Sequence, residues 1–435
     1  MLVPRFAKWE NGNRKDLLTD GKSGAINQNL VRGANTAKRP QSKHMNSDPH
    51  ASTDSTGDVD LRITPGKRRR KSCLTVFLVV VMLFGSGVTW YCVKQKQARQ
   101  RYQTVELIDR KGGNVAWKEP SPLELILSMV FGKDFFAAVI AVEGSDTSLD
   151  DGDMRQIAGL SQLKTLWLGD TRITDAGIAH LKNLTRLEDL RLANTKITDA
   201  GLAHLKGLSH LRQLDLFGTT VTDEGLASLT GLTSLEKLGL SRTRITGSGL
   251  KHLETLKHLR ALGLRDTDFT DADTRHLESL PCLRELWIGG TRITDDALES
   301  IGKRGDLRTL DLRETNISSA GLRHLAGAKK LYWLGLADTQ VDDTGMQYVA
   351  RLPKLGHLHL QNTDVGDQGL KYLSTLRNLQ LLNLHKTRVT DAGLKHLETH
   401  QGLNFLFVAN TQVTDEGLQR LKIALPKLRH IDTGK

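Results

Sequence analysis

The sequence predicts an α/β solenoid, a curved horseshoe with a concave parallel β-sheet and convex helices, preceded by one transmembrane helix and a disordered tail. The first observation is a Leu-x-x-Leu-x-Leu pattern that starts at Leu163 and returns every 24 residues, without a slip, until Leu403. One unit of this length cannot bury its own apolar side, so units with a fixed period stack around a shared core. The other observations are an uncharged stretch at 72–93 and a polar region before it.

Each of the eleven units contains one strand and one helix. In the first unit, Leu166 and Leu168 alternate with outward positions such as Trp167, and this period of two predicts a short strand. The side chain of either Thr174 or Asp175 is expected to cap the helix that follows. That helix is predicted from an apolar set spaced by three residues, Ile178, Leu181 and Leu184. Parallel strands about 4.8 Å apart then form a concave face on the order of 50 Å long, a surface for a macromolecule.

The unit Leu163-x-x-Leu166-x-Leu168-x-x-Thr171-x-Ile173 and its ten successors resemble the leucine-rich repeat family over about two thirds of the chain. The motif Thr-x-Ile-Thr-Asp-x-Gly-Leu is similar to the repeats of bacterial membrane-anchored members and, in part, to those of F-box leucine-rich repeat receptors. Where the family usually has Asn, this chain has Thr, and we expect the hydroxyls to form a similar but shorter ladder. These residues are Thr171, Thr195, Thr219, Thr243, Thr267, Thr291, Thr315, Thr339, Thr363, Thr387 and Thr411. The resemblance implies a recognition module that uses no cofactor.

Degenerate units are expected to cap both ends of the core. The repeat domain is predicted to extend over 139–435, with a weaker copy of the unit starting at Val139 and a last strand at Leu428 and Ile431. A juxtamembrane and capping region is predicted at 94–138. It should contain a helix over 99–110, a strand near Val115 and a helix over 122–131.

The uncharged stretch at 72–93 is predicted to be a single-pass transmembrane helix that acts as a signal anchor. At 1.5 Å per residue its 22 residues give about 33 Å of helix, enough for a hydrocarbon core of about 30 Å. A dense basic cluster directly before it favours a cytoplasmic N-terminus and an exported repeat domain. This membrane-flanking cluster is Lys67, Arg68, Arg69, Arg70 and Lys71. Basic residues also follow the stretch, so the margin between the two orientations is small.

The positive charge of the chain lies mostly outside the repeats. Residues 1–71 carry 15 basic and 7 acidic side chains, and their low apolar content predicts a disordered tail. Residues 139–435 carry 38 basic and 37 acidic side chains, so the repeat domain is close to neutral. A horseshoe that binds nucleic acid would be expected to carry the excess itself, and we therefore expect no nucleic-acid partner.

The outward strand positions provide the candidate partner-binding residues of the concave face. Tryptophan and phenylalanine with scattered charges of both signs are typical of protein and peptide interfaces. An alternative is that some of these aromatic side chains only shield the sheet. The candidates are Trp167, Arg191, Asp215, Trp287, Asp311, Trp333, His359, Phe405 and Phe407.

Two sets of side chains on this face are alternatives to a partner-binding role. His357, His359 and His385 fall on neighbouring strands and are a weak candidate for a shared zinc ion, without an evident carboxylate or cysteine as a further ligand. Asp215 and Asp311 are four repeats apart, about 19 Å, too far for a pair of catalytic carboxylates. The sequence therefore predicts neither a resident metal nor an enzyme.

The sequence thus favours a non-enzymatic, membrane-anchored recognition protein that binds a protein or peptide on its concave face and the membrane through 72–93. The alternative is a substrate-recognition subunit of a ubiquitin ligase, because of the partial F-box likeness. That class needs an adaptor-binding helical region ahead of the repeats, where this chain has a polar tail and an apolar stretch.

Overall fold

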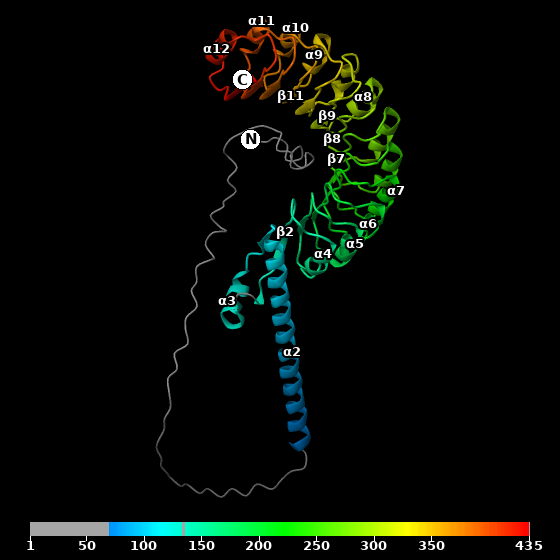
Figure 1. Cartoon of the computed structure of the whole chain (residues 1–435), viewed down its shortest axis with the longest axis vertical. Helices are drawn as coiled ribbons and strands as arrows, with labels where there is room; N and C mark the ends of the chain where they lie inside the picture. The colour runs from blue at the N-terminus through cyan, green and yellow to red at the C-terminus, as the bar shows by residue number, and fades with distance from the viewer. Residues whose placement is uncertain (1–68, 133–134, 435) are drawn as a thin grey trace, which may run out of the picture. The chain divides into compact units, whose positions relative to one another are not determined.

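The computed structural model describes residues 69–132 and 135–434, with side chains from Gly87 onward. Its contacts divide the chain into two units, one of which includes all residues from Lys94 to Lys435. Figure 1 shows the repeats of that unit as a curved array, with the strands on the inner side and the helices on the outer side. The concave sheet and convex helices that the sequence predicts are therefore confirmed.

The strands of this unit form one 14-stranded sheet and follow each other in chain order. Strand β1 pairs antiparallel with β2, and all later neighbours pair in parallel. The strands are β1 (Asn114–Trp117), β2 (Val139–Glu143), β3 (Thr165–Trp167), β4 (Asp189–Arg191), β5 (Gln213–Asp215), β6 (Lys237–Gly239), β7 (Ala261–Gly263), β8 (Glu285–Trp287), β9 (Thr309–Asp311), β10 (Trp333–Gly335), β11 (His357–His359), β12 (Leu381–Asn383), β13 (Phe405–Phe407) and β14 (His430–Asp432).

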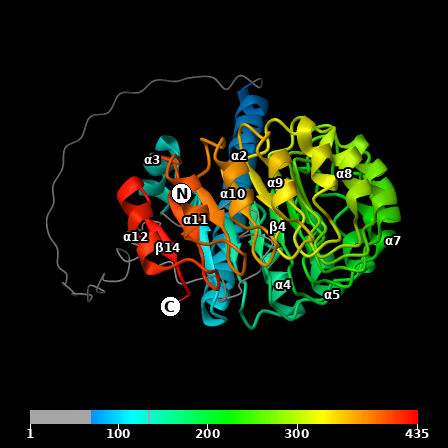
Figure 2. The ribbon, with the colours of Figure 1, turned by 90° about the horizontal axis from the view of Figure 1, so that it is seen from above.

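The convex side consists of short α-helices and 3-10 helices (η), which Figure 2 shows from above along the outer side of the curve. Within the described residues the α-helices are α2 (Arg69–Arg110), α3 (Pro122–Phe131), α4 (Asp151–Ile157), α5 (Asp175–Ile178), α6 (Asp199–Ala203), α7 (Asp223–Leu226), α8 (Asp295–Gly302), α9 (Asp343–Val349), α10 (Asp367–Leu373), α11 (Asp391–Leu394) and α12 (Asp415–Ala424). The 3-10 helices are η3 (Ala179–Asn183), η4 (Ala227–Leu229), η5 (Gly247–Leu253), η6 (Asp271–Ser279), η7 (Gly321–Gly327) and η8 (Lys395–Leu397).

A continuous core of leucine, isoleucine and valine runs through the array. The three apolar residues of each regular strand motif are buried, as Leu163, Leu166 and Leu168 illustrate with no exposed surface, and they pack on buried apolar residues of the repeat helices. The core begins at the capping region, where Ile108 of α2 is also fully buried. Each repeat therefore covers the apolar side of its neighbour, as the 24-residue period predicts.

The threonine of each turn bonds within its own repeat. The hydroxyl of Thr171 donates to the carbonyl of Leu168 in its own repeat at 2.6 Å, and its successors do the same. The residue before each of these threonines has a positive φ, for example Asp170 at 58°. The threonine thus closes a tight local turn, and the same short bond recurs in every regular unit without joining neighbouring repeats.

Side-chain hydrogen bonds between repeats are formed at the start of most helices, where an aspartate stands, whereas Gly247 and Ser319 replace it in two repeats. Asp175 accepts hydrogen bonds from the backbone N–H of Thr198 at 2.8 Å and from its hydroxyl at 2.6 Å. Thr174 caps the helix by accepting from the N–H of Ala176, so the two candidate caps have separate roles. The carboxylate bond to the next repeat recurs at Asp151, Asp175, Asp199, Asp223, Asp271, Asp295, Asp343, Asp367 and Asp391.

The capping region matches its predicted elements. Helix α3 covers 122–131 as predicted, and β1 contains Val115. The predicted helix over 99–110 is the last part of α2, which begins at Arg69. Residues 69–71 are accordingly helical and do not belong to a tail. The rest of the predicted tail, including Lys67 and Arg68, lies outside the described residues.

Among the residues whose side chains the structure describes, none of the helices is long and apolar enough to span a bilayer. Residues 72–86, most of the predicted span, precede Gly87 and lie outside the side chains described.

Candidate interaction surface on the concave face

The strand register aligns the candidate residues in rows across the concave face. One row joins Trp167 to Arg191 and Arg191 to Asp215, and it continues through Trp287 and Asp311. The row then runs through Gly335, His359, Asn383 and Phe407 to Asp432. The neighbouring row contains Thr309, Trp333, His357, Leu381, Phe405 and His430. All nine predicted candidates therefore belong to these two rows of outward positions.

The first candidates form a small group on β3 and β4. The indole N–H of Trp167 donates to the carboxylate of Asp189 at 3.1 Å, and the guanidinium of Arg191 lies 4.0 Å from the centre of the Trp167 ring. Arg191 also lies 3.4 Å from the same carboxylate. The cation–π contact and the hydrogen bond hold the half-buried Trp167 ring of β3 against side chains of β4.

Asp215, on the next strand, is 2% exposed. Burial raises the pKa of its carboxyl to about 7, although the N–H of Phe217 and the nearby Arg191 act in the opposite direction. The carboxylate of Asp189 adds to the increase. Asp215 is therefore partly protonated near neutral pH, because few polar groups replace its lost hydration.

The centre of the face contains a second buried carboxylate with the opposite behaviour. Asp311 has no exposed surface and accepts two hydrogen bonds from the guanidinium of Arg313, both at 2.7 Å. Arg265 lies 3.6 Å from the same carboxylate and 3.6 Å from Glu314. Burial alone would raise the pKa of Asp311, but the charge and hydrogen bonds of Arg313, followed by the charge of Arg265, hold it below its usual value. We call these four residues the central charge cluster.

Two of the predicted aromatic anchors differ from the expectation of exposed side chains. Trp287 is 1% exposed and Trp333 is 5% exposed. The Trp333 ring lies over Gly335, where an added Cβ would stand 2.7 Å from its Cη2 atom. The ring also contacts Arg313, with 5.6 Å to the guanidinium carbon, and His359, with 4.9 Å between ring centres. Trp333 thus lies flat along the sheet because the glycine beside it leaves room.

The histidines of β11 are held in the neutral state. Burial lowers the pKa of His357 to about 4, and burial followed by the charge of Arg313 lowers the pKa of His359 to about 3. The hydroxyl of Tyr332 lies 3.2 Å from Nε2 of His357 and donates to Gln380 at 3.0 Å. At pH 7 these imidazoles therefore add polar but uncharged surface to the face.

The proposed histidine metal site gains no further ligand in the structure. In the described part of the chain, no three histidine, cysteine or acidic side chains are arranged to hold a metal ion. Nε2 of His385 lies 3.4 Å from the carboxylate of Asp432. His385 is therefore oriented toward an acidic side chain of the last strand, which sequence spacing alone did not indicate.

The last four strands present a compact set of rings. Phe407 lies 5.7 Å from His385 and 5.6 Å from His430, and Phe405 lies 6.3 Å from His430, all between ring centres. Their rings are half-buried, as is Leu381 between them and β11. We call Leu381, His385, Phe405, Phe407 and His430 the C-terminal aromatic patch. It contains two of the three predicted aromatic candidates whose rings keep exposed surface, and the third is Trp167.

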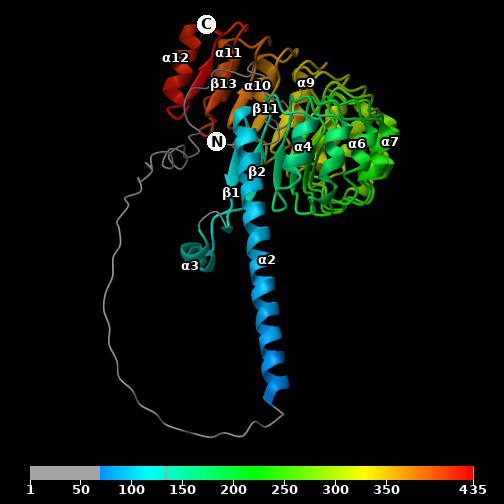
Figure 3. The same cartoon turned by 60° about the horizontal axis from the view of Figure 1, so that its bottom comes forward.

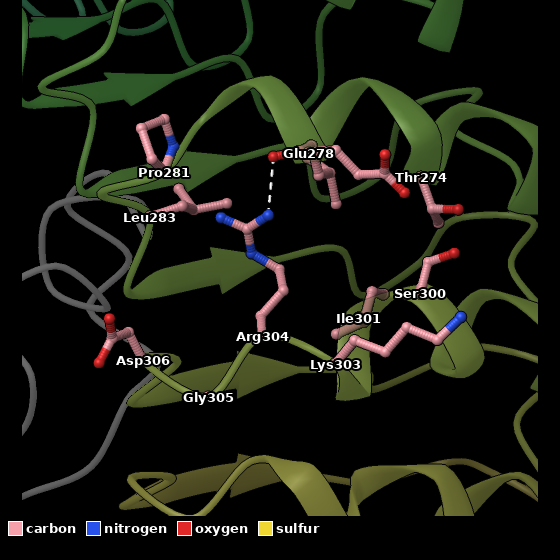
Figure 4. Close-up of a pocket in the computed structure, with 11 residues that line it drawn as sticks. Thr274, Glu278, Pro281, Leu283, Ser300, Ile301, Lys303, Arg304, Gly305 and Asp306 are labelled. Atoms are coloured by element: carbon pink, nitrogen blue, oxygen red, sulfur yellow. Dashed lines mark hydrogen bonds between the residues drawn. The ribbon is translucent and has the colours of Figure 1, made fainter.

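A separate pocket lies on the convex side, between η6 and α8 (Figure 4). Its volume is about 390 Å³, and Arg304 extends across it toward the turn that contains Glu278. The guanidinium donates to the carbonyl of Leu277 at 2.8 Å and to that of Leu280. Burial lowers the pKa of Arg304. The sequence analysis missed this residue, although it stands 24 residues after the core residue Leu280 and thus replaces a leucine.

Comparison with known proteins agrees with the repeat pattern. A sequence profile described as a leucine-rich repeat region matches residues 151–434. Similar solved structures include an internalin from Listeria monocytogenes, 24% identical over 68% of this chain and 85% of that chain, with a TM-score of 0.49. A leucine-rich repeat protein from Leptospira interrogans is 19% identical over 63% of this chain and 80% of that chain, with a TM-score of 0.43. A TDR receptor is 16% identical over 68% of this chain and 51% of that chain, with a TM-score of 0.45. No curated protein matches the chain.

The matched region contains all eleven regular units and extends over more than half of the 435 residues. The chain therefore belongs to the leucine-rich repeat family.

Proposed function

We propose that this chain is a membrane-anchored, non-enzymatic recognition protein that binds a protein or peptide on its concave face. The observation that carries the proposal is the C-terminal aromatic patch on the same face as the central charge cluster, with β10 and β11 between them. Phenylalanine rings with partly exposed surface supply contact area at a low entropic cost, and arginine with aromatic residues is typical of binding hot spots. A partner that covers both regions would combine apolar anchors with charged contacts that fix its orientation.

The neutral histidines support an apolar contact at the patch. His357 and His359 stay uncharged at pH 7 because of their burial, so they do not oppose the desolvation of neighbouring rings. The charge next to them is concentrated at Asp311 and its two arginines. This separation favours a ligand whose apolar segment lies over β12 to β14 and whose polar segment reaches β7 to β9.

An enzymatic role gains no support from the buried carboxylates. The strands of Asp215 and Asp311 are separated by three others in the sheet. Asp311 is bound to Arg313, and Asp215 accepts from the N–H of Phe217. Neither acid is paired with a nucleophile or a second acid as hydrolysis requires. The ubiquitin-ligase alternative also gains no support, since the family match includes the repeats alone.

The binding role is tested by placing the photocrosslinker p-benzoylphenylalanine at single positions of the full chain in cells. We expect Phe407 on the concave face to crosslink a partner, whereas Ile423, an 83% exposed residue of α12, serves as the convex control. With that partner purified, the Phe405→Ala/Phe407→Ala double variant should bind at least about tenfold more weakly. Unchanged affinity, or crosslinks from position 423 and none from 407, would contradict binding on this face.

The membrane anchor is a separate part of the proposal. Residues 72–93 contain no charged side chain, and all of them fall within the single helix α2. The basic run before this stretch supports a cytoplasmic N-terminus and exported repeats. We expect the chain to stay with membranes after alkaline washing and its repeats to be digested by protease added to intact cells. Release by alkali would remove the anchor from the proposal, and full protection of the repeats would reverse the orientation.

A further inference from the structure

Helix α3 has an apolar surface that the described chain leaves uncovered. Five of its ten residues are apolar side chains between 51% and 84% exposed, and none of its residues is buried. These side chains are Leu123, Leu125, Ile126, Met129 and Val130. Exposed apolar surface of this density on a short helix indicates an interaction site.

The exposed apolar surface covers nearly half of the helix circumference. At about 100° per residue, the five exposed apolar side chains occupy an arc of about 160°, and the polar side chains Glu124 and Ser128 lie together on the opposite side. A helix that packs on a protein core presents an apolar stripe of about 100°. A broad medium that covers one whole side of α3 fits this arc better than a narrow groove.

The polar groups of α3 are satisfied within the chain. The side chain of Ser121 accepts from the N–H of Glu124, and the carboxylate of Glu124 accepts from the N–H of Ser121 at 2.7 Å. Lys118 lies 3.3 Å from the same carboxylate, and the Ser128 hydroxyl donates to the carbonyl of Leu125 at 2.6 Å. These bonds lower the cost of moving the helix into a medium of low polarity.

The path of the chain places α3 toward the Lys94 end of its unit. The Trp117 ring at the end of β1 lies 5.6 Å from the Tyr102 ring of α2, so β1 runs back along the last turns of α2 before α3 begins. Figure 3 shows α3 extending beyond β1 and away from the repeats. The residues that follow Val93, from 94 to 105, include four basic and no acidic side chains: Lys94, Lys96, Arg99 and Arg101.

We propose that α3 is an interfacial helix that inserts its apolar arc into the headgroup region of a bilayer rich in anionic lipid. The inference rests on the proposed anchor, because residues 72–93 would hold this end of the unit at the membrane. Basic side chains of α2 then face anionic headgroups, and the wide apolar arc of α3 enters the boundary with the acyl chains. With α3 and the α2 anchor both attached, the repeat domain would be held in one orientation at the surface.

The test uses the full chain in vesicles of phosphatidylcholine and phosphatidylglycerol. Cys73, Cys92 and Cys282 are changed to serine, and one new cysteine carries an environment-sensitive fluorophore. Met129→Cys, 84% exposed, reports on α3, and Ile423→Cys, 83% exposed, is the matched control on the repeats. We expect nitroxide-labelled lipid to quench about half of the fluorescence at position 129, as insertion to about 5–10 Å implies, and to leave position 423 unchanged.

A paired alkaline wash separates the inference from the anchor. Retained protein with quenching at position 129 supports both, and quenching in a chain that alkali releases supports the helix without the anchor. If the protein is retained and lipid quenches the fluorophores at positions 129 and 423 equally, the interfacial helix is overturned and the anchor is still supported. A shift of the fluorescence at 129 that depends on protein concentration, without lipid quenching, also overturns it, because the occupant is then a second copy. Loss of quenching in Ile126→Glu, with the chain still retained, would assign the effect to the apolar arc.

Discussion

Replacing Gly225 by alanine is expected to lower the free energy of unfolding by about 3 kcal/mol. Alanine normally stabilises a helix relative to glycine by about 1 kcal/mol. Here the new methyl group would overlap Oδ1 of Asp199 and lie 3.1 Å from Cδ1 of Leu202. Asp199 uses that oxygen to accept from the N–H of Thr222, so relief of the overlap would break a bond between two repeats. Urea unfolding of the full chain, followed by far-ultraviolet circular dichroism, measures the change.

Gly231→Ala is the matched control for this variant. An added Cβ at Gly231 meets only the carbonyl of Lys206, at 3.6 Å, which is an ordinary contact. Its unfolding midpoint should remain close to that of the parent. The double variant Asp199→Ala/Gly225→Ala should be more stable than the sum of the two single effects predicts, because the overlap disappears with the carboxylate. A Gly225→Ala chain as stable as the parent would show that the ladder has room for a methyl group.

Replacing Asp311 by alanine should cost about 3 kcal/mol of stability. The carboxylate is fully buried and neutralises Arg313 at 2.7 Å, with Arg265 at 3.6 Å. Without this carboxylate, the two partly buried guanidinium groups would face each other with no anion between them. Such a change costs more stability than the loss of an exposed ion pair. The control is Asp364→Ala, which breaks the exposed pair with Arg388 and should change stability by less than about 1 kcal/mol.

The effect of Asp311 should also depend on pH in a defined direction. Since its pKa is lower in the folded chain than in the unfolded chain, its ionised form stabilises the fold above the ordinary carboxyl pKa. That stability is lost as the pH falls through the lowered pKa of the folded state. The difference in the free energy of unfolding between the parent and Asp311→Ala should therefore be largest near neutral pH and become smaller in acid. If this difference in unfolding free energy stays constant as the pH is lowered, packing and not charge accounts for the stability lost in Asp311→Ala.

The period of the leucines was enough to predict the sheet, the helices and their stacking. A strict 24-residue spacing allows one register, because a slip would turn every leucine of a strand to the solvent. The same spacing places the outward residues in rows, so the neighbours of Trp167 or Phe407 across the sheet follow from the sequence. Helix α3 was also predictable, since Ser121 and Glu124 form a capping box before an apolar run.

The conformations of side chains within those rows did not follow from the sequence. Whether Trp333 stands out from the sheet or lies along it depends on the space over Gly335 and on contacts with two other strands. The opposite pKa shifts of Asp215 and Asp311 depend in the same way on whether an arginine reaches the carboxylate. The place of Arg304 does follow from the spacing, because it stands where earlier repeats have a buried leucine such as Leu256 or Leu280.

The bond between each helix-start aspartate and the following repeat has a further consequence for how such a chain grows. Asp175 needs only a partner 23 residues later, and that partner belongs to the adjoining unit. Duplication or loss of one whole 24-residue segment that carries this aspartate therefore leaves the neighbouring joints of the same kind with a donor and an acceptor. Gene rearrangement can lengthen or shorten the inner face by one strand, about 4.8 Å, while the joints on either side keep their chemistry.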